Sequence, residues 1–300
     1  METFGTRPIR AGQAVADDGL HLYWRAVGEG PALLCNNGVG VSTFFWRYFV
    51  EQFSDRYTVV TWDYRGHGRS DPLPDPTSGE VAIPRHTRDM LTVMDAAGLD
   101  EVVVCGHSMG CQVGLEAWRT APHRIRGYLL VLGTAGRALE TFADNPRSPF
   151  FFRLAGQLVA SLGDRTHRIV RPLLRSPIAW SFTLRTKLVD PLYTRKEDFA
   201  PYLEHLAVLD MRMFIRTVNQ MQHHDAWDLL GGVTVPVLII GAENDAFTPI
   251  RLSRKMASSI PGAELLVLAD ASHAAIIEQP ETINHRFERF LREHQPFAPQ

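Results

Sequence analysis

The chain has 300 residues, of which 45% are hydrophobic and 21% are charged. A chain of this length can bury roughly three quarters of its unfolded surface, so it can fold without disulfides or a metal. The composition is typical of a globular protein and excludes disorder, collagen and coiled coil. The net charge of -2 argues against nucleic acid as the main partner, since nucleic-acid-binding proteins usually carry a basic excess.

The cysteines and the N-terminal residues indicate a compartment. Cys35, Cys105 and Cys111 have no spacing typical of a disulfide framework, and we expect buried, reduced thiols, which suits the cytoplasm. Residues 1–13 lack the apolar core of a signal peptide, and no apolar run is long enough to span a membrane. We therefore expect a cytoplasmic protein.

Short apolar runs alternate with helical patterns along most of the chain. Residues 9–15 and 20–27 flank an Asp-Gly pair, which predicts a hairpin. Later runs rich in Val, Ile and Leu predict strands that are buried on both faces of a parallel sheet; they are 32–35, 57–62, 101–105, 128–132, 235–240 and 265–268. The helical patterns between them are 43–53, 86–97, 109–121, 249–260 and 280–293. This alternation predicts a doubly wound α/β sheet.

Residues 136–227 break the rhythm, because they contain helical patterns and no convincing strand. Examples are 149–162 and 201–221, with prolines at 146, 149, 172, 177, 191 and 201 expected to start or stop the helices. A segment of this length is too long for an ordinary crossover. We therefore predict a helical lid at 136–227, inserted between two strands of a core formed by 1–135 and 228–300.

The stretch Gly106-His107-Ser108-Met109-Gly110 follows a predicted strand and precedes a predicted helix. In a Gly-x-Ser-x-Gly turn the small residues permit a tight, strained bend, which raises the serine hydroxyl above the sheet at the N-terminus of the next helix. The sequence therefore predicts Ser108 as a catalytic nucleophile.

A serine hydroxyl needs a base, and the base needs a carboxylate that orients it. Of the 12 histidines, His273 lies in a loop after the last predicted strand, where parallel sheets present active sites. Asp245 follows the preceding predicted strand and is our candidate for the carboxylate. Glu243 competes with it, and Asp270 is the acid nearest to His273 in the sequence.

An oxyanion that forms on the substrate needs two backbone N–H donors. We expect them at Met109, directly after the nucleophile, and at Val39, in the loop that follows residues 32–35. No metal or cofactor is implied. The pair His223-His224 beside Asp225 could suggest a metal site, but adjacent histidines point in different directions, which favours a linker.

These motifs resemble those of the α/β-hydrolase superfamily, in its lidded esterase, lipase and C–C hydrolase branch. Ser108, Asp245 and His273 stand in the chain order that the superfamily uses. The stretch Asp63-Tyr64-Arg65-Gly66-His67-Gly68 resembles a structural loop found in many members, which implies no catalytic role for His67. One departure is Asn37 before Gly38, where members often have His-Gly. The resemblance covers essentially the whole chain.

The resemblance implies a serine carboxylic-ester hydrolase that acts through an acyl-enzyme on small to medium, rather apolar acyl esters, including monoacylglycerol-like lipids. A C–C bond hydrolase of ring-cleavage products is the alternative, with lid arginines binding a carboxylate. Lactone or thioester hydrolysis, and reuse of the fold as a ligand-binding module, also stay open, because a fold does not decide its chemistry.

The predicted lid differs in charge from the rest of the chain. Residues 137–196 contain 11 basic and 4 acidic residues together with many large apolar ones. Such a lid could rest on an anionic membrane surface or admit an acyl chain. For membrane contact we favour the alternative, in which the apolar residues pack on the core and the arginines are solvated.

Overall fold

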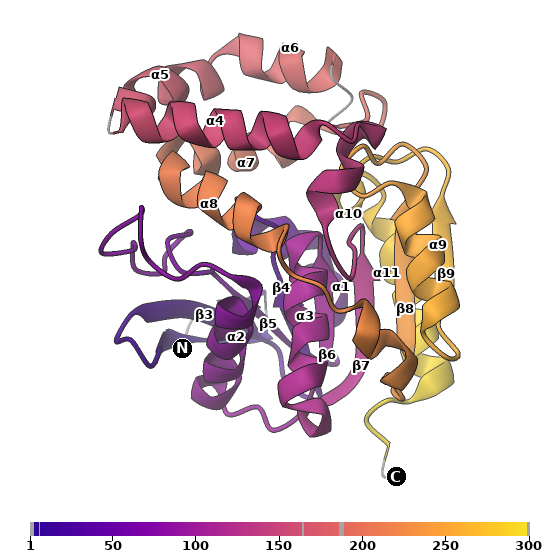
Figure 1. The fold of residues 1–300 in the computed structure, drawn as a ribbon. Helices are drawn as coiled ribbons and strands as arrows, with labels where there is room; N and C mark the ends of the chain where they lie inside the picture. The colour runs from indigo at the N-terminus through magenta and orange to yellow at the C-terminus, as the bar shows by residue number, and fades with distance from the viewer. Residues whose placement is uncertain (1–2, 6, 164, 186–188, 299–300) are drawn as a thin grey trace.

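The computed structural model describes residues 3–5, 7–163, 165–185 and 189–298. Its sheet has nine strands in the order β1-β2-β3-β5-β4-β6-β7-β8-β9 (Figure 1). The strands are β1 Thr3–Phe4, β2 Arg7–Val15, β3 His21–Val27, β4 Ala32–Asn36, β5 Thr58–Trp62, β6 Val102–His107, β7 Ile125–Val131, β8 Val237–Ala242 and β9 Glu264–Leu268.

The sheet is antiparallel at one edge and parallel elsewhere. β1, β2, β3 and β5 pair antiparallel, whereas β5, β4, β6, β7, β8 and β9 pair parallel. The carboxyl ends of the parallel strands therefore meet at one edge of the sheet. The predicted α/β class is confirmed, and the short strand β1 is an element that the sequence patterns did not reveal.

Helices cover both faces of the sheet and bury two separate cores. α2 Ile83–Ala97, α3 Met109–Thr120 and α9 Ile250–Ser259 pack on one face, and α1 Arg47–Phe53 and α11 Pro280–His294 pack on the other. Residues of β6 alternate between the cores: Val102 and Val104 face the first, and Val103 and Cys105 face the second. This period of two explains why buried parallel strands are apolar throughout.

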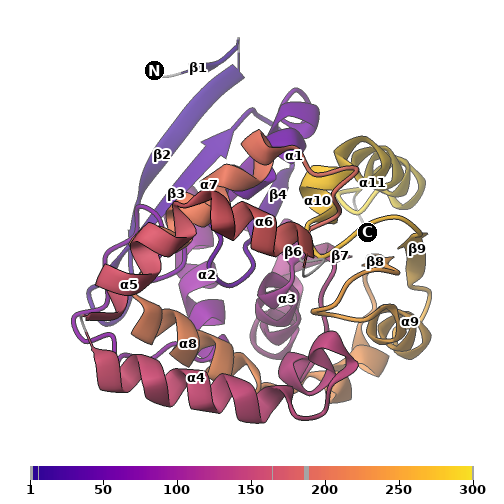
Figure 2. The same ribbon diagram turned by 90° about the horizontal axis from the view of Figure 1, so that it is seen from above.

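Between β7 and β8 the chain forms helices, with no strand among the residues described there. We call α4 to α8 the cap helices; they are α4 Ser148–Leu162, α5 Arg165–Leu174, α6 Pro177–Arg185, α7 Lys196–Val208 and α8 Met211–Met221. They lie above the edge where the parallel strands end (Figure 1), and the view from above shows them spread over the sheet (Figure 2). Shorter helices are η1 Thr43–Trp46, η2 Pro122–Arg124, η3 Ala138–Asp144, η4 Trp227–Gly232 and α10 Ala275–Glu278.

Two expectations for this segment are wrong. The continuous pattern 201–221 is two helices, because the side chain of Asp210 accepts hydrogen bonds from the N–H groups of Arg212 and Met213 and so begins α8. Pro172 and Pro201 lie inside α5 and α7 and do not start or stop a helix there. A proline removes one backbone donor, and the helix can continue where its other turns are packed.

The predicted state of the thiols is confirmed, since Cys35, Cys105 and Cys111 are free and buried. Among the residues described, no helix has both the length and the apolarity that crossing a bilayer would require.

Candidate active site

Ser108 stands between β6 and α3 in a backbone conformation that side chains rarely adopt. Its φ is 54° and its ψ is -117°, and a non-glycine residue held there costs on the order of 1–3 kcal/mol. The N–H of Ser108 donates to the carbonyl of Val131 at 3.0 Å, which fixes the turn to β7. The bend therefore holds the hydroxyl at the carboxyl edge of the sheet, at the start of a helix.

The two glycines of the motif are needed because the backbone packs so closely at this bend. A Cβ on Gly106 would lie 2.6 Å from the carbonyl oxygen of Gly110, and a Cβ on Gly110 would lie 2.2 Å from that of Asn36. Both contacts are with backbone atoms, which cannot move aside as the end of a side chain can. Any side chain at these positions would displace the turn that carries Ser108.

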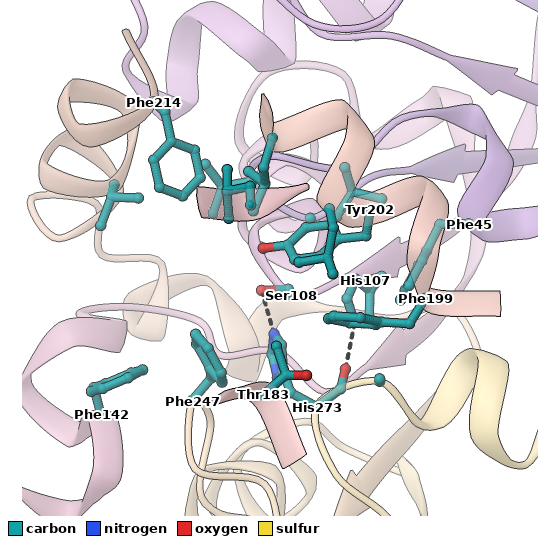
Figure 3. A pocket seen from close by; sticks show the side chains of 18 of the residues that line it. Phe45, His107, Ser108, Phe142, Thr183, Phe199, Tyr202, Phe214, Phe247 and His273 are labelled. Atoms are coloured by element: carbon teal, nitrogen blue, oxygen red, sulfur yellow. Dashed lines mark hydrogen bonds between the residues drawn. The ribbon is translucent and has the colours of Figure 1, made fainter. Parts of the chain in front are cut away.

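The structure brings Ser108, His273 and Asp245 together from three separate loops. Nε2 of His273 lies 2.9 Å from Oγ of Ser108 (Figure 3), and its Nδ1 lies 3.0 Å and 2.9 Å from the two carboxylate oxygens of Asp245. Asp245 is buried and also accepts from the N–H groups of Phe247 and Thr248 and from the Thr248 hydroxyl. The hydroxyl, the imidazole and the carboxylate thus form one hydrogen-bonded row, which is the arrangement of a serine-hydrolase triad.

The competing carboxylates lie elsewhere. Glu243 is exposed and lies 3.9 Å from Arg254. Asp270 is also exposed, and it is the Asp270 carbonyl that accepts a hydrogen bond from the side chain of Gln279. Of the three acids weighed from the sequence, the structure gives only Asp245 a contact with His273 among the residues described.

The loop after β4 carries the predicted backbone donor Val39 to the same place. Val39 and Ser108 line one cavity, and a Cβ on Gly38 would lie 3.2 Å from the Cβ of Ser108. Met109 begins α3, so its N–H has no acceptor within the helix. The two predicted donors thus belong to segments next to Ser108, one in the loop after β4 and one at the start of α3.

Asn37, which stands where members of the superfamily often have histidine, is buried and holds this loop in place through hydrogen bonds. Its side-chain NH₂ donates to the carbonyl of Trp62 at 2.6 Å, and its side-chain oxygen accepts from the indole N–H of Trp46 at 3.0 Å. Its backbone carbonyl accepts from the hydroxyl of Tyr64 at 2.8 Å. The asparagine therefore holds the loop by both ends of its amide.

His67, to which the sequence assigned no catalytic role, also supports this loop. Its Nε2 lies 3.2 Å from the backbone nitrogen of Gly40, the neighbour of Val39, and its Nδ1 lies 3.0 Å from the carbonyl of Arg65. The ring can accept from Gly40 only in its neutral form. The role of His67 as a positioning residue depends on a contact across 27 positions of sequence, which no local pattern signals.

Glu278 joins the loop of His273 to the segment between α6 and α7. Its carboxylate accepts from the N–H and the hydroxyl of Ser272 at 2.8 Å and 2.7 Å. The same carboxylate accepts from the N–H of Asp190 and the hydroxyl of Thr194. Phe247 stacks on the His273 ring at 4.7 Å between centroids, so both the loop and the ring of His273 are held in place.

Buried histidines predict that the protein loses stability in mild acid. Burial lowers the pKa of His67 to about 4 and that of His107 to about 3, from 6.5. As pH falls below 6.5, the unfolded chain binds protons that the folded chain does not, so the free energy of unfolding decreases until the folded pKa is reached. By pH 5 the loss is on the order of 2 kcal/mol per histidine.

We therefore expect the thermal midpoint, measured by circular dichroism, to fall by several degrees between pH 7 and pH 5. The control is His123→Gln, because His123 is exposed and its loss should leave the slope unchanged. A midpoint that stays constant over this interval would contradict the assignment of His67 and His107 as buried neutral rings.

A cavity of about 430 Å³ lies beneath the cap helices and reaches Ser108 and His273. Its walls are formed mainly by aromatic and aliphatic side chains, several of which surround the serine in Figure 3. The aromatic members are Phe45, Phe142, Phe152, Phe182, Phe199, Tyr202, Phe214 and Phe247. No Asp, Glu, Lys or Arg is found among the described residues that line it.

His224, one of the two histidines weighed as a metal site, has other contacts. Nε2 of His224 lies 3.0 Å from Glu116, and its Nδ1 lies 3.4 Å from the Gln112 amide. Within the described part of the chain, no group of three or more His, Cys, Asp or Glu side chains is arranged to hold a metal ion.

Comparisons with known proteins agree with this fold. "Putative carbamate hydrolase RutD" of Azorhizobium caulinodans is 28% identical over 272 residues, covering 91% of this chain and 95% of that protein. A thermophilic esterase from Thermogutta terrifontis superposes with a TM-score of 0.76 at 22% identity, covering 95% of this chain and 99% of that one. The enol-lactonase from Burkholderia xenovorans LB400 superposes with a TM-score of 0.72 at 22% identity, over 94% and 100% of the two chains.

The relatives carry hydrolase names, which supports a general hydrolase function, and the structural neighbours show the same fold. The family model for the alpha/beta hydrolase fold matches residues 31–280, a span that includes the bend at Ser108, Asp245, His273 and the cap helices. The chain belongs to the α/β hydrolase fold family.

Proposed function

We propose that the protein is a serine carboxylic-ester hydrolase that acts on small to medium, apolar acyl esters, with monoacylglycerol-like lipids among them. The observation that carries the proposal is the uncharged, largely apolar cavity that ends at the Ser108 hydroxyl. An apolar acyl chain can fill such a cavity, and few polar groups are needed to orient the ester at its end. In this proposal the cap helices act as a lid over the acyl site.

In the proposed reaction, Oγ of Ser108 attacks the ester carbonyl carbon while Nε2 of His273 takes the hydroxyl proton. Asp245 holds the imidazole in the tautomer that leaves Nε2 free, and stabilises its charged form. The N–H groups of Val39 and Met109 donate to the oxyanion. His273 then gives its proton to the leaving alcohol, and a water molecule hydrolyses the acyl-enzyme with His273 again acting as base.

The C–C hydrolase alternative receives less support. It relied on lid arginines to bind the carboxylate of a ring-cleavage product, and no arginine is found among the described residues that line the cavity. A buried carboxylate without a cationic partner would be costly. The same argument disfavours a charged, compact substrate for this cavity.

We expect activity on p-nitrophenyl esters to rise with acyl length until the cavity is full. Each methylene moved from water into an apolar site contributes about 0.8 kcal/mol, which is about fourfold in kcat/KM. The octanoate ester should therefore be cleaved with a higher kcat/KM than the butyrate, and the palmitate ester should fall again because it exceeds the space available.

The same panel should contain a ring-cleavage product, a lactone and a simple carbamate. The matched cavity variant is Phe152→Ala, a lining residue on α4, which enlarges the cavity and should shift the optimum to longer chains. Preference for the ring-cleavage product or the carbamate over every p-nitrophenyl ester would contradict the proposal.

A further inference from the structure

The outer face of the cap helices carries a row of exposed apolar side chains. Phe151, Leu154 and Leu158 are three or four residues apart, which places them along one side of α4, and Phe150 adjoins them. Their exposed fractions lie between 53% and 59%. The expectation that the apolar residues of this segment pack on the core is therefore wrong for these side chains. A contiguous apolar surface of this kind marks a binding site.

The apolar surface continues onto the next two helices. Ile169 and Leu173 on α5, and Ile178 and Phe182 on α6, are each more than half exposed. α5 contacts both α4 and α6, and the three helices lie at the end of the molecule opposite the C-terminus (Figure 1). Most of the large, exposed apolar side chains described in the chain thus lie at one end.

This surface meets the acyl cavity. Leu173, Ile178 and Phe182 line the cavity and are also among the exposed residues. One wall of the cavity is therefore part of the apolar outer surface. An acyl chain that entered the cavity past α5 and α6 would stay in apolar surroundings until it reached Ser108 and His273.

The charge of the same helices indicates what covers them. Residues 148–185 contain six basic residues and one acidic residue. Arg153, Arg165, Arg168 and Arg171 lie on the same two helices, α4 and α5, and are exposed. A second copy of this chain would bring like charges together across the contact, whereas an anionic surface is complementary. Helices that combine exposed apolar side chains with arginines are typical of those that lie in the plane of an anionic bilayer.

We propose that α4, α5 and α6 form a docking surface for anionic phospholipid bilayers. Phe151, Leu154 and Leu158 enter the boundary between headgroups and acyl chains, and the arginines contact the lipid phosphates. The substrate ester then passes from the bilayer into the cavity past Leu173 and Ile178. This last step depends on the proposed ester hydrolysis, whereas the docking itself does not.

The test is flotation of the full chain with vesicles made of equal parts phosphatidylcholine and phosphatidylglycerol, compared with vesicles of phosphatidylcholine alone. We expect binding to the anionic vesicles that weakens with salt. Phe151→Gln combined with Leu158→Gln should weaken it about tenfold or more. Arg168→Gln combined with Arg171→Gln should weaken it about fivefold per arginine.

Matched controls change the same residue types elsewhere. Val15→Gln replaces an exposed apolar residue of β2, and Arg289→Gln removes an exposed arginine of α11; both should leave vesicle binding unchanged. All these positions lie outside the cavity lining, so hydrolysis of dissolved p-nitrophenyl butyrate should be equal in every variant. If the unmodified protein does not hydrolyse this ester, the result counts against the proposed function. The docking surface is then still decided by the flotation experiment.

Three results would overturn the docking surface. The first is that the unmodified protein does not float with anionic vesicles. The second is that the α4 and α5 variants float with these vesicles as well as the unmodified protein does. The third is a dimer, measured by light scattering, that Phe151→Gln with Leu158→Gln converts to a monomer, since the surface would then join two copies of the chain.

Discussion

Ser108→Ala should abolish ester hydrolysis, with kcat lowered by about 10⁶ in a steady-state assay with p-nitrophenyl butyrate. The substitution removes the only atom that can form the acyl-enzyme in the proposed reaction and leaves the rest of the site in place. An alanine at position 108 has a Cβ as serine does, so it can occupy the same backbone conformation, in which φ is 54°. The bend should therefore persist, and the thermal midpoint should change little.

The residual rate is informative as well. In hydrolases of this type, an oxyanion site and substrate binding alone still give about 10³–10⁴ over water. The control is Ser258→Ala, an exposed serine of α9 whose hydroxyl bonds the Lys255 carbonyl, which should retain full activity. Retention of most activity by Ser108→Ala would show that the nucleophile is another group.

Asp245→Asn should lower kcat by about 10⁴. The carboxylate of Asp245 accepts from Nδ1 of His273 and so keeps Nε2 free to accept the Ser108 proton. An asparagine can present its NH₂ to Nδ1, which favours the tautomer with the proton on Nε2. That ring cannot act as a base toward Ser108, although the geometry is almost unchanged.

The competing acids supply matched controls for this prediction. Glu243→Gln and Asp270→Asn change exposed carboxylates that make no described contact with His273, and both should retain activity. Because Asp245 also accepts from Phe247 and Thr248, the thermal midpoint of Asp245→Asn must be measured beside its kinetics. An active Asp245→Asn combined with an inactive Glu243→Gln would move the orienting role to Glu243.

Features governed by local rules were predictable from the sequence. The bend at Ser108 needs small residues at 106 and 110, and the structure gives each of them a backbone neighbour closer than any side chain allows. The buried parallel strands were readable because both of their faces are apolar. The break at Asp210 could also have been found, since aspartate before a helical pattern is an N-cap signal.

Features that depend on distant contacts were not predictable. His67 supports Gly40, and Glu278 joins Ser272 to Asp190, only because the fold brings these segments together. The apolar spacing of α4 is the same whether a core covers that side or not, so exposure of Leu154 and Leu158 required the structure. Local patterns thus located the candidate site, whereas its supporting contacts and the exposed surface of the cap helices required the fold.

The central claim is that an acyl group is transferred to Ser108. Its most direct test is to quench the reaction with p-nitrophenyl octanoate within one turnover and map the modified peptide by mass spectrometry. The account predicts one octanoyl group on Ser108, formed together with a burst of p-nitrophenol and missing from Ser108→Ala. Turnover of the ester with Ser108 unmodified, or with the acyl group on another residue, would contradict it.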